Sequence, residues 1–203
     1  YKVSCVGYTL AKEQVQYANS VLKDLPVEIR CEDYRNAAKT GEKFDRVVSV
    51  GFFEHIGVHN FRTYFEVVEK CMKDDGLSLL HTITARDQGI PKAGEFADKH
   101  VFPGGMVPHP EDFQMYSEGL LVIEDIQNFG AYYTPTLQAW HANFKTNWSK
   151  LEASYGQKKN GRFYRMWEWY LLWSAACFNS RVLMLYQVVQ SKRGIAGGYE
   201  SVR

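Results

Sequence analysis

Three polar positions in this chain could together move a proton or bind a small oxyanion. Glu54 and His55 follow one apolar run, His81 lies near the end of a second, and Tyr132 and Tyr133 follow a third. A carboxylate, an imidazole and a phenol would suit acid–base chemistry if they shared one pocket. Taken singly, Glu54 is as readily explained as a solvated loop carboxylate, and His81 has about even odds of being a buried core histidine.

A metal site is the competing interpretation of the same histidines. His55 and His59 are four residues apart, and His81 is available as a third ligand. The intervening segment 56–58 does not have a helical pattern, so the two imidazoles need not lie on one face. We therefore assign no metal ligands.

The elements that must position these groups have the pattern of an α/β fold. The segments 3–8, 27–31, 44–51, 77–83, 120–126 and 182–190 are predicted strands, and 44–51 is expected to be buried on both faces. Helices are predicted near 12–22, 60–72, 110–117, 134–155 and 160–180. Alternating strands and helices imply parallel pairing with right-handed crossovers. Because carboxyl ends of neighbouring parallel strands meet at one crevice, Glu54, His81 and Tyr133 are expected to converge there.

Composition excludes several classes of protein. The chain has 203 residues and a formal net charge of +1, so no field of one sign exists to recruit nucleic acid. We find no apolar run of about 20 residues and no signal-peptide layout, which favours a soluble cytoplasmic protein. Four widely spaced cysteines are expected to be buried and reduced. The stretch 84–118 is an expected irregular insertion, and 134–180 an expected helical segment.

Aromatic residues make up 15% of the chain and gather in its last predicted helix. Trp169 and Trp173 share a face at helical spacing, whereas Trp167 does not. Together with Tyr170 they could form electron-rich walls around a cation. We expect the majority of them to be core residues instead.

Four segments in order along nearly the whole chain carry a resemblance to a known family. They are Phe44–Gly57 (FDRVVSVGFFEHIG), Leu79–Ile83 (LLHTI), Phe102–Gly105 (FPGG) and Asn128–Tyr133 (NFGAYY). With these segments the chain resembles the cyclopropane-fatty-acyl-phospholipid synthases, which are class I S-adenosylmethionine-dependent methyltransferases related to the mycolic acid cyclopropane synthases.

The resemblance implies a reaction on unsaturated phospholipid acyl chains. A methyl group passes to a cis double bond, and a bound bicarbonate takes the proton that leaves as the cyclopropane ring closes. It implies that Glu54, His81, Tyr133 and the backbone amide of Ile83 hold the bicarbonate. It also implies a cytoplasmic enzyme peripheral to the inner face of the membrane, and it leaves a homodimer open. Ser174 stands where the family carries a cysteine, which puts a thiol role in doubt.

The resemblance also implies a set of residues that bind S-adenosylmethionine. They are Thr9 and Gln14 at the ribose, Asp33 and Tyr34 at the adenine, and Ser49 and Gly51 near the methionine part. Without the resemblance, Thr9 would be a helix N-cap and Tyr34 a surface aromatic.

By this resemblance we expect a Rossmann-like class I methyltransferase sheet with helices on both faces. Residues 1–203 would be a single catalytic domain, incomplete at the N-terminus, because the family's first strand and glycine-rich cofactor loop should precede Tyr1. We expect this chain alone to be inactive and to bind the cofactor weakly. Two alternatives stay open: a sibling methyltransferase that makes a branched acyl chain, and a truncated, non-catalytic lipid-binding remnant.

Overall fold

A computed structural model describes residues 2–87, 94–155 and 158–201. Its elements are β1 (Cys5–Thr9), α1 (Lys12–Val21), β2 (Val27–Cys31), η1 (Tyr34–Asn36), α2 (Ala37–Thr40), β3 (Phe44–Val50), η2 (Phe53–His55), η3 (Val58–Asn60), α3 (Phe61–Cys71), β4 (Met72–Ala85), α4 (Gly94–His100), α5 (Pro110–Ser117), β5 (Val122–Asn128), α6 (Gly130–Thr146), α7 (Trp148–Tyr155), α8 (Arg162–Asn179) and β6 (Leu183–Ser191). Each predicted strand is present, shifted by at most a few residues. The stretch 84–118 contains α4 and α5, and its residues 88–93 lie outside the described part.

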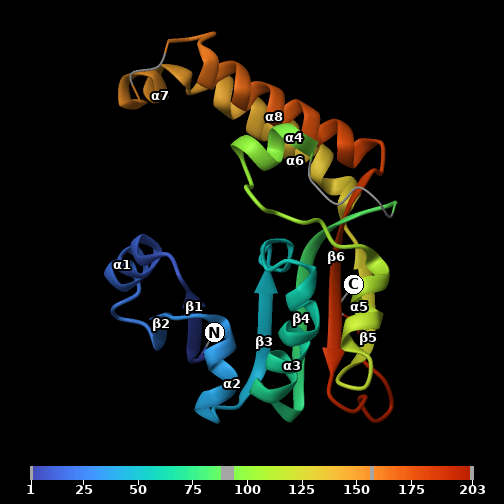
Figure 1. Cartoon of the computed structure of the whole chain (residues 1–203). Helices are drawn as coiled ribbons and strands as arrows, with labels where there is room; N and C mark the ends of the chain where they lie inside the picture. Colours follow the sequence, from blue (N-terminus) through green and yellow to red (C-terminus); the bar gives the residue numbers. More distant parts are fainter. Residues whose placement is uncertain (1, 88–93, 156–157, 202–203) are drawn as a thin grey trace.

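The strands form two separate sheets (Figure 1). One has four strands in the order β3-β4-β6-β5, and the other is the β1–β2 pair. The β1–β2 and β3–β4 pairs are parallel, as predicted. Parallel β3 and β4 put the segments that follow them, η2 and the end of β4, at the same edge of the sheet.

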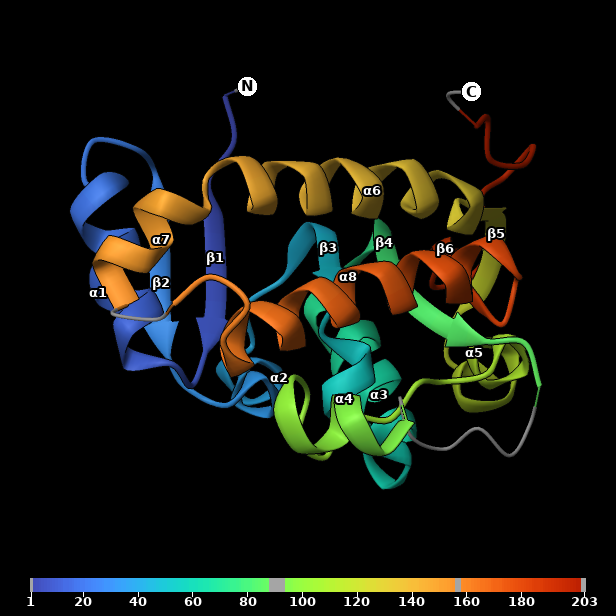
Figure 2. The same cartoon turned by 90° about the horizontal axis from the view of Figure 1, so that it is seen from above.

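The expectation of parallel pairing is wrong for β6, which runs antiparallel to both β4 and β5. The reason is the path of the chain after β5. Helices α6 and α8 lie side by side across the carboxyl edge of β3 (Figures 1 and 2). Since α8 ends at this edge, β6 starts there and runs in the opposite direction.

Helix α3 forms because its apolar residues recur at three- and four-residue spacing. Helix α3 lies on one face of the four-stranded sheet, beside α5 (Figure 2). Its apolar stripe belongs to a cluster of buried side chains. The cluster contains Phe53, Phe61, Tyr64, Phe65, Val68, Met72, Leu80, Phe113, Leu121 and Val188. Because Phe53 belongs to it, the short η2 helix and the neighbouring Glu54 are fixed to the sheet edge.

Strand β3 is not buried on both faces, which corrects the sequence expectation. Val47 packs against the α3 cluster, but Val48 and Val50 on the opposite face are each 63% exposed. Within the described residues β3 pairs with β4 alone, so its other edge is open. An apolar run in the sequence cannot distinguish a strand that is covered on both faces from one that is not.

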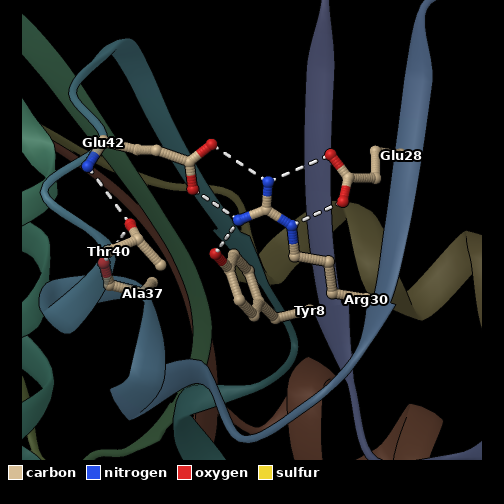
Figure 3. A network of polar contacts seen from close by, with 6 residues as sticks. All are labelled: Tyr8, Glu28, Arg30, Ala37, Thr40 and Glu42. Carbon is tan, nitrogen blue, oxygen red and sulfur yellow. Dashed lines mark hydrogen bonds and ion pairs between the residues drawn. The ribbon is translucent and has the colours of Figure 1, made fainter.

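The β1–β2 pair is tied to the chain leading into β3 by Arg30 (Figure 3). Its guanidinium bonds Glu28 (2.7 Å from Nε to Oε1), Glu42 and the hydroxyl of Tyr8 (2.7 Å). The side chain of Arg30 is only 19% exposed. These bonds to two carboxylates raise the pKa of Arg30, so the charge is retained under all ordinary conditions.

Two expectations about side-chain burial are wrong. Cys5 and Cys31 are exposed because they lie at the ends of the thin β1–β2 sheet, although Cys71 is buried. Trp167 and Trp169 are also exposed. Tyr170 and Trp173 are half-buried, so most of these four aromatic residues are not core residues. Trp169 and Trp173 do share a face, with ring centroids 5.4 Å apart.

Among the helices of the described ranges, none combines the length and the apolarity that crossing a membrane requires.

Candidate active site

Glu54 lies in η2, directly beyond the end of β3, and its side chain is buried with 7% exposure. Its Oε1 accepts a hydrogen bond from the backbone amide of Ile83 on β4, at 2.7 Å. Its Oε2 is also buried and has no hydrogen-bonding partner among the described residues. A buried carboxylate oxygen without a donor is costly, so this atom is suited to receive a donor from a bound molecule.

The loop after α4 holds the backbone of Glu54. The amide of Met106 donates to the carbonyl of Glu54 at 2.8 Å. Gly104 enters this loop with φ of +73°, a left-handed conformation that favours glycine. A Cβ on Gly105 would lie 3.1 Å from the carbonyl oxygen of Phe102. The FPGG segment thus acts as a tight turn that fixes the carboxylate's backbone.

His81 lies on β4, two residues before Ile83. Its Nδ1 is 3.1 Å from Nε2 of Gln187, its register partner on β6. Burial lowers the pKa of His81, and the nearby negative charge of Glu54 partly opposes that shift. The carbonyl of His81 accepts the amide of Gly51 at 2.9 Å. The structure therefore brings Glu54, His81 and Ile83 together, and His81 favours the neutral imidazole.

Tyr133 approaches the same place from α6. Helix α6 starts close against β6 because Gly130 has no side chain: a Cβ there would lie 3.0 Å from the Cα of Met184. The ring of Tyr133 lies 4.9 Å from that of Phe178 and packs against an apolar cluster that also contacts Ile83. Among the described residues its hydroxyl forms no hydrogen bond with Glu54 or His81. Tyr133 therefore shares with Ile83 the apolar cluster beside these residues.

A groove of about 750 Å³ lies between the β1 edge and the β3 edge. Ser49 and Tyr34, two of the predicted cofactor-binding residues, line it together with Tyr8, Phe52 and Tyr64. The hydroxyl of Tyr34 is buried, and no partner for it exists among the described residues. Burial raises the pKa of Tyr34, so the hydroxyl stays protonated and can donate. The volume and the unpaired hydroxyl fit a nucleoside-sized molecule such as S-adenosylmethionine.

The other predicted cofactor residues are not part of this groove's described lining. Thr9 Oγ1 bonds Gln14 Oε1 at 2.7 Å and accepts the amide of Ala11 at 3.2 Å, as a turn-forming threonine does. Asp33 caps η1, and its hydrogen bonds from Arg35 lower its pKa to about 2.

Gly51 follows β3 with φ of +60°, and no atom lies within 4 Å of the position of a Cβ. The backbone conformation, and not a lack of space, would strain a side chain there.

The histidines considered as metal ligands lie apart from one another. His55 ends η2, with its ring centroid 5.6 Å from that of Phe102, and His59 is exposed in η3. In the part of the chain that the structure describes, no three His, Cys, Asp or Glu residues gather as metal ligands would.

Gln187 is a candidate site residue that was not predicted from the sequence. It is the one strongly polar side chain in the segment Leu183–Val189, which is otherwise apolar or aromatic. A glutamine in the middle of a central strand needs a hydrogen-bonding partner, and that requirement was the available signal.

Comparison with known proteins identifies the family of this chain. The family model described as "Mycolic acid cyclopropane synthetase" matches residues 1–188. The chain belongs to this family. The cyclopropane-fatty-acyl-phospholipid synthase of Escherichia coli (strain K12) is 39% identical over 203 residues, which are all of this chain and 51% of that protein. A probable fatty acid methyltransferase of Pseudomonas putida is 32% identical, over 95% of this chain and 50% of its own.

Structural comparison agrees with the family assignment. The mycolic acid cyclopropane synthase CmaA1, solved in complex with SAH and CTAB, superposes with a TM-score of 0.81 and 25% identity. The superposition covers 95% of this chain and 71% of that chain. The fold is thus that of the class I methyltransferases within the cyclopropane synthase family, as the sequence predicted. The chain spans about half the length of the curated relatives named above.

Proposed function

We propose that this chain carries the proton-handling site of an S-adenosylmethionine-dependent enzyme that converts a cis double bond of a phospholipid acyl chain into a cyclopropane ring. The observation that carries the proposal is the state of Glu54. One carboxylate oxygen is held by the Ile83 amide at 2.7 Å, and the other is buried without a partner beside His81. Such a pair suits the orientation of a small hydroxyl-bearing anion.

S-adenosylmethionine would supply the methyl group, and bicarbonate would supply the acceptor for the proton lost at ring closure. In this proposal Oε2 of Glu54 accepts the hydroxyl of the bicarbonate, and His81 donates to one of its other oxygens. Tyr133 would close the pocket from α6. The Ile83 amide contributes through Glu54, since its hydrogen is already donated to that carboxylate. Tyr34 and Ser49 would bind the cofactor in the groove between the sheets.

Apolar and aromatic side chains lie next to the proposed site. Ile83, Phe129, Tyr133 and Tyr170 pack against a cluster that includes the buried Leu137 and Phe178. A carbocation in an acyl chain needs such protection from hydrolysis, together with electron-rich walls. These side chains therefore support a reaction on an apolar substrate.

We also propose that the α6–α8 layer faces a lipid surface. Residues 132–181 contain seven lysines and arginines against two glutamates, although the whole chain is close to neutral. Trp140, Trp167, Trp169 and Leu172 are exposed on the same layer. Basic and aromatic side chains together suit the headgroup region of an anionic membrane. The enzyme would work from the cytoplasm at the inner face of the membrane.

Glu54→Gln tests the proposed role of the unpaired oxygen. Glutamine keeps Oε1 as the acceptor for the Ile83 amide and replaces Oε2 with an NH₂ group, so the fold is retained while the acceptor is lost. We expect cyclopropane formation to fall by about 10² to 10⁴, the usual contribution of a positioned acid–base group. Products from unsaturated phospholipid vesicles are quantified by mass spectrometry.

Because the chain spans half the relatives' length, the assay uses this sequence substituted for the matching part of the Escherichia coli relative. The control is Glu66→Gln on the exposed side of α3, where the carboxylate is 44% exposed. Turnover of the Glu54→Gln protein at the control's rate would remove Glu54 from the mechanism.

We further propose that the 203 residues by themselves bind S-adenosylmethionine weakly. The groove is open between two sheets that no strand bridges within the described residues, so its walls are poorly fixed. Ligand sites of high affinity are usually preformed. Isothermal titration of the chain with the cofactor should give no micromolar binding, and a micromolar dissociation constant would contradict this.

A second candidate is a methyltransferase that leaves a branched acyl chain without closing the ring. The observation in its favour is the 32% identity to the probable fatty acid methyltransferase of Pseudomonas putida. Both reactions need the same methyl donor and the same substrate. In the second reaction the cation is resolved by hydride or by water. The products then differ in mass, because ring closure adds a net CH₂, whereas hydride gives a net CH₄ and water a net CH₄O. The mass-spectrometric assay described above separates them.

A further inference from the structure

Gln187 makes the one polar contact to the imidazole of His81 that the described residues provide. The two residues are register partners on the antiparallel strands β4 and β6, so both side chains lie on the same face of the sheet. Nε2 of Gln187 lies 3.1 Å from Nδ1 of His81. The ladder between the strands holds both Cα atoms, which makes this contact a fixed feature of the sheet.

The chemistry of the two nitrogens determines the direction of the bond. A glutamine Nε2 is an NH₂ group and can only donate, so Nδ1 of His81 must accept. A neutral imidazole carries one hydrogen, and it must then lie on Nε2.

We propose that Gln187 is a positioning residue that fixes His81 in the Nε2–H tautomer, so that the imidazole presents a hydrogen-bond donor to the active site. His81 would then serve as a donor to an oxyanion rather than as the base that removes a proton. The inference rests on the proposed function only for the identity of the anion that receives this hydrogen bond.

The groups around the imidazole agree with this assignment. They are the carboxylate of Glu54 from η2, the amide of Gln187 from β6, and Val50, the register partner of His81 on β3. Burial lowers the pKa of His81, so the neutral ring that has tautomers is the favoured form. Within the described residues Nε2 has no hydrogen-bonding partner, which leaves it available to a ligand.

The tautomer is measured directly by ¹⁵N NMR of the histidine side chains in the 203-residue chain, with His81 assigned by its loss in His81→Gln. We expect Nδ1 of His81 to resonate as an unprotonated nitrogen and Nε2 as a protonated one. Gln187→Glu replaces the donor with an acceptor and should move a proton onto Nδ1. Gln187→Leu removes the donor and should leave a mixture of tautomers.

Gln127→Leu is the matched control. Gln127 is the register partner of Gln187 on the next strand, β5, so the substitution removes the same kind of side chain one strand further from His81. Its His81 spectrum should equal that of the unsubstituted chain.

Three results would overturn the inference. The first is an Nδ1–H tautomer in the unsubstituted chain, which needs no variant to fold. The second is a His81 spectrum unchanged by both Gln187→Glu and Gln187→Leu. The third is an equal change caused by Gln127→Leu.

Activity gives an independent readout. In the chimeric enzyme we expect Gln187→Leu to lower kcat by about 10- to 100-fold with little change in KM, as for other partners that orient a functional histidine. If Glu54→Gln left full activity while the tautomer was as expected, the proposed function would fail and the assignment of Gln187 would stand.

Discussion

The two carboxylate oxygens of Glu54 are in different situations, and this difference defines the candidate site. Oε1 is held by a backbone amide of β4, while Oε2 is buried with no donor among the described residues. Leaving a charged acceptor unpaired costs about 1–3 kcal/mol or more. A protein can retain such a cost where a bound molecule relieves it, and we therefore propose that the atom marks a binding position.

At the scale of single residues, His81 should make stability depend on pH. Burial lowers its pKa from 6.5 in the folded chain, so below about pH 6.5 the unfolded chain takes up a proton before the folded one. The free energy of unfolding should therefore fall as the pH drops from 6.5 toward the lower pKa of the folded state. His81→Gln removes this contribution and should flatten the curve in that window.

Urea unfolding at a series of pH values, followed by circular dichroism, measures the difference between the two proteins. Titratable groups that do not interact with His81 should contribute alike in both proteins and cancel. A difference that stayed constant across the window would show that His81 has the same pKa in the folded and unfolded chains.

At the scale of elements, α3 is the part that holds the site edge in place. Its stripe of aromatic side chains packs against Phe53, and Phe53 immediately precedes Glu54. The ring centroids of Phe53 and Phe61 are 4.1 Å apart, and those of Phe53 and Phe65 are 5.6 Å apart. The position of the carboxylate thus depends on helix packing as well as on its own hydrogen bond.

Phe65→Ala should lower the free energy of unfolding by about 3–5 kcal/mol, the usual cost of removing a buried phenylalanine. Phe65 is fully buried, and alanine is a good helix former, so the loss reflects packing rather than helix propensity. Chemical denaturation measures it. Met115→Ala on α5, where the side chain is 55% exposed, should change stability by about 0.5 kcal/mol or less. Equal effects of the two substitutions would contradict the described core.

The helices and strands were predictable from the sequence because their signals are local. The spacing from Phe61 to Val68 predicts α3, and the alternation in 27–31 predicts β2 with its observed ends. The direction of β6 and the exposure of β3 were not predictable in the same way. The direction of β6 depends on the path of α6 and α8, which is about 50 residues of chain. The exposure of β3 depends on whether other elements pack beside it.

The candidate site residues likewise fall into those that the sequence predicts and those that only the tertiary structure shows. Glu54, His81 and Ile83 converge because η2 and the end of β4 follow neighbouring parallel strands, which a sequence pattern implies. Gln187 belongs to a strand that reaches the site from the opposite direction. No local spacing connects it to His81, so the pairing emerges only from the register of β4 and β6.

At the scale of the whole molecule, the β1–β2 pair has the weakest structural connection to the rest of the described fold. Two-stranded sheets are marginal on their own, and this pair has no ladder to the four-stranded sheet within the described residues. Arg30 is the link between them, through Glu42 and Tyr8 (Figure 3). The Arg30–Glu42 ion pair therefore supports one wall of the groove that would hold the cofactor.

Arg30→Met should loosen this wall without affecting the rest of the protein. The substitution leaves Glu28 and Glu42 without their shared cation, so their repulsion opens the contact. We expect faster amide hydrogen exchange in β1 and β2 and unchanged exchange in β4 and β6, measured by mass spectrometry of peptic peptides. Arg46→Met, an exposed arginine on β3, is the control. Uniform acceleration across all strands would mean that Arg30 supports the whole fold instead.

The open edge of β3 should make the chain prone to aggregation at high protein concentration. It presents unpaired backbone groups next to Val48 and Val50, and such an edge invites a neighbouring molecule to add its own strand. Concentrated solutions should therefore lose protein to precipitation well below the temperature of unfolding. Val48→Lys would place a charge beside that edge and should reduce this precipitation.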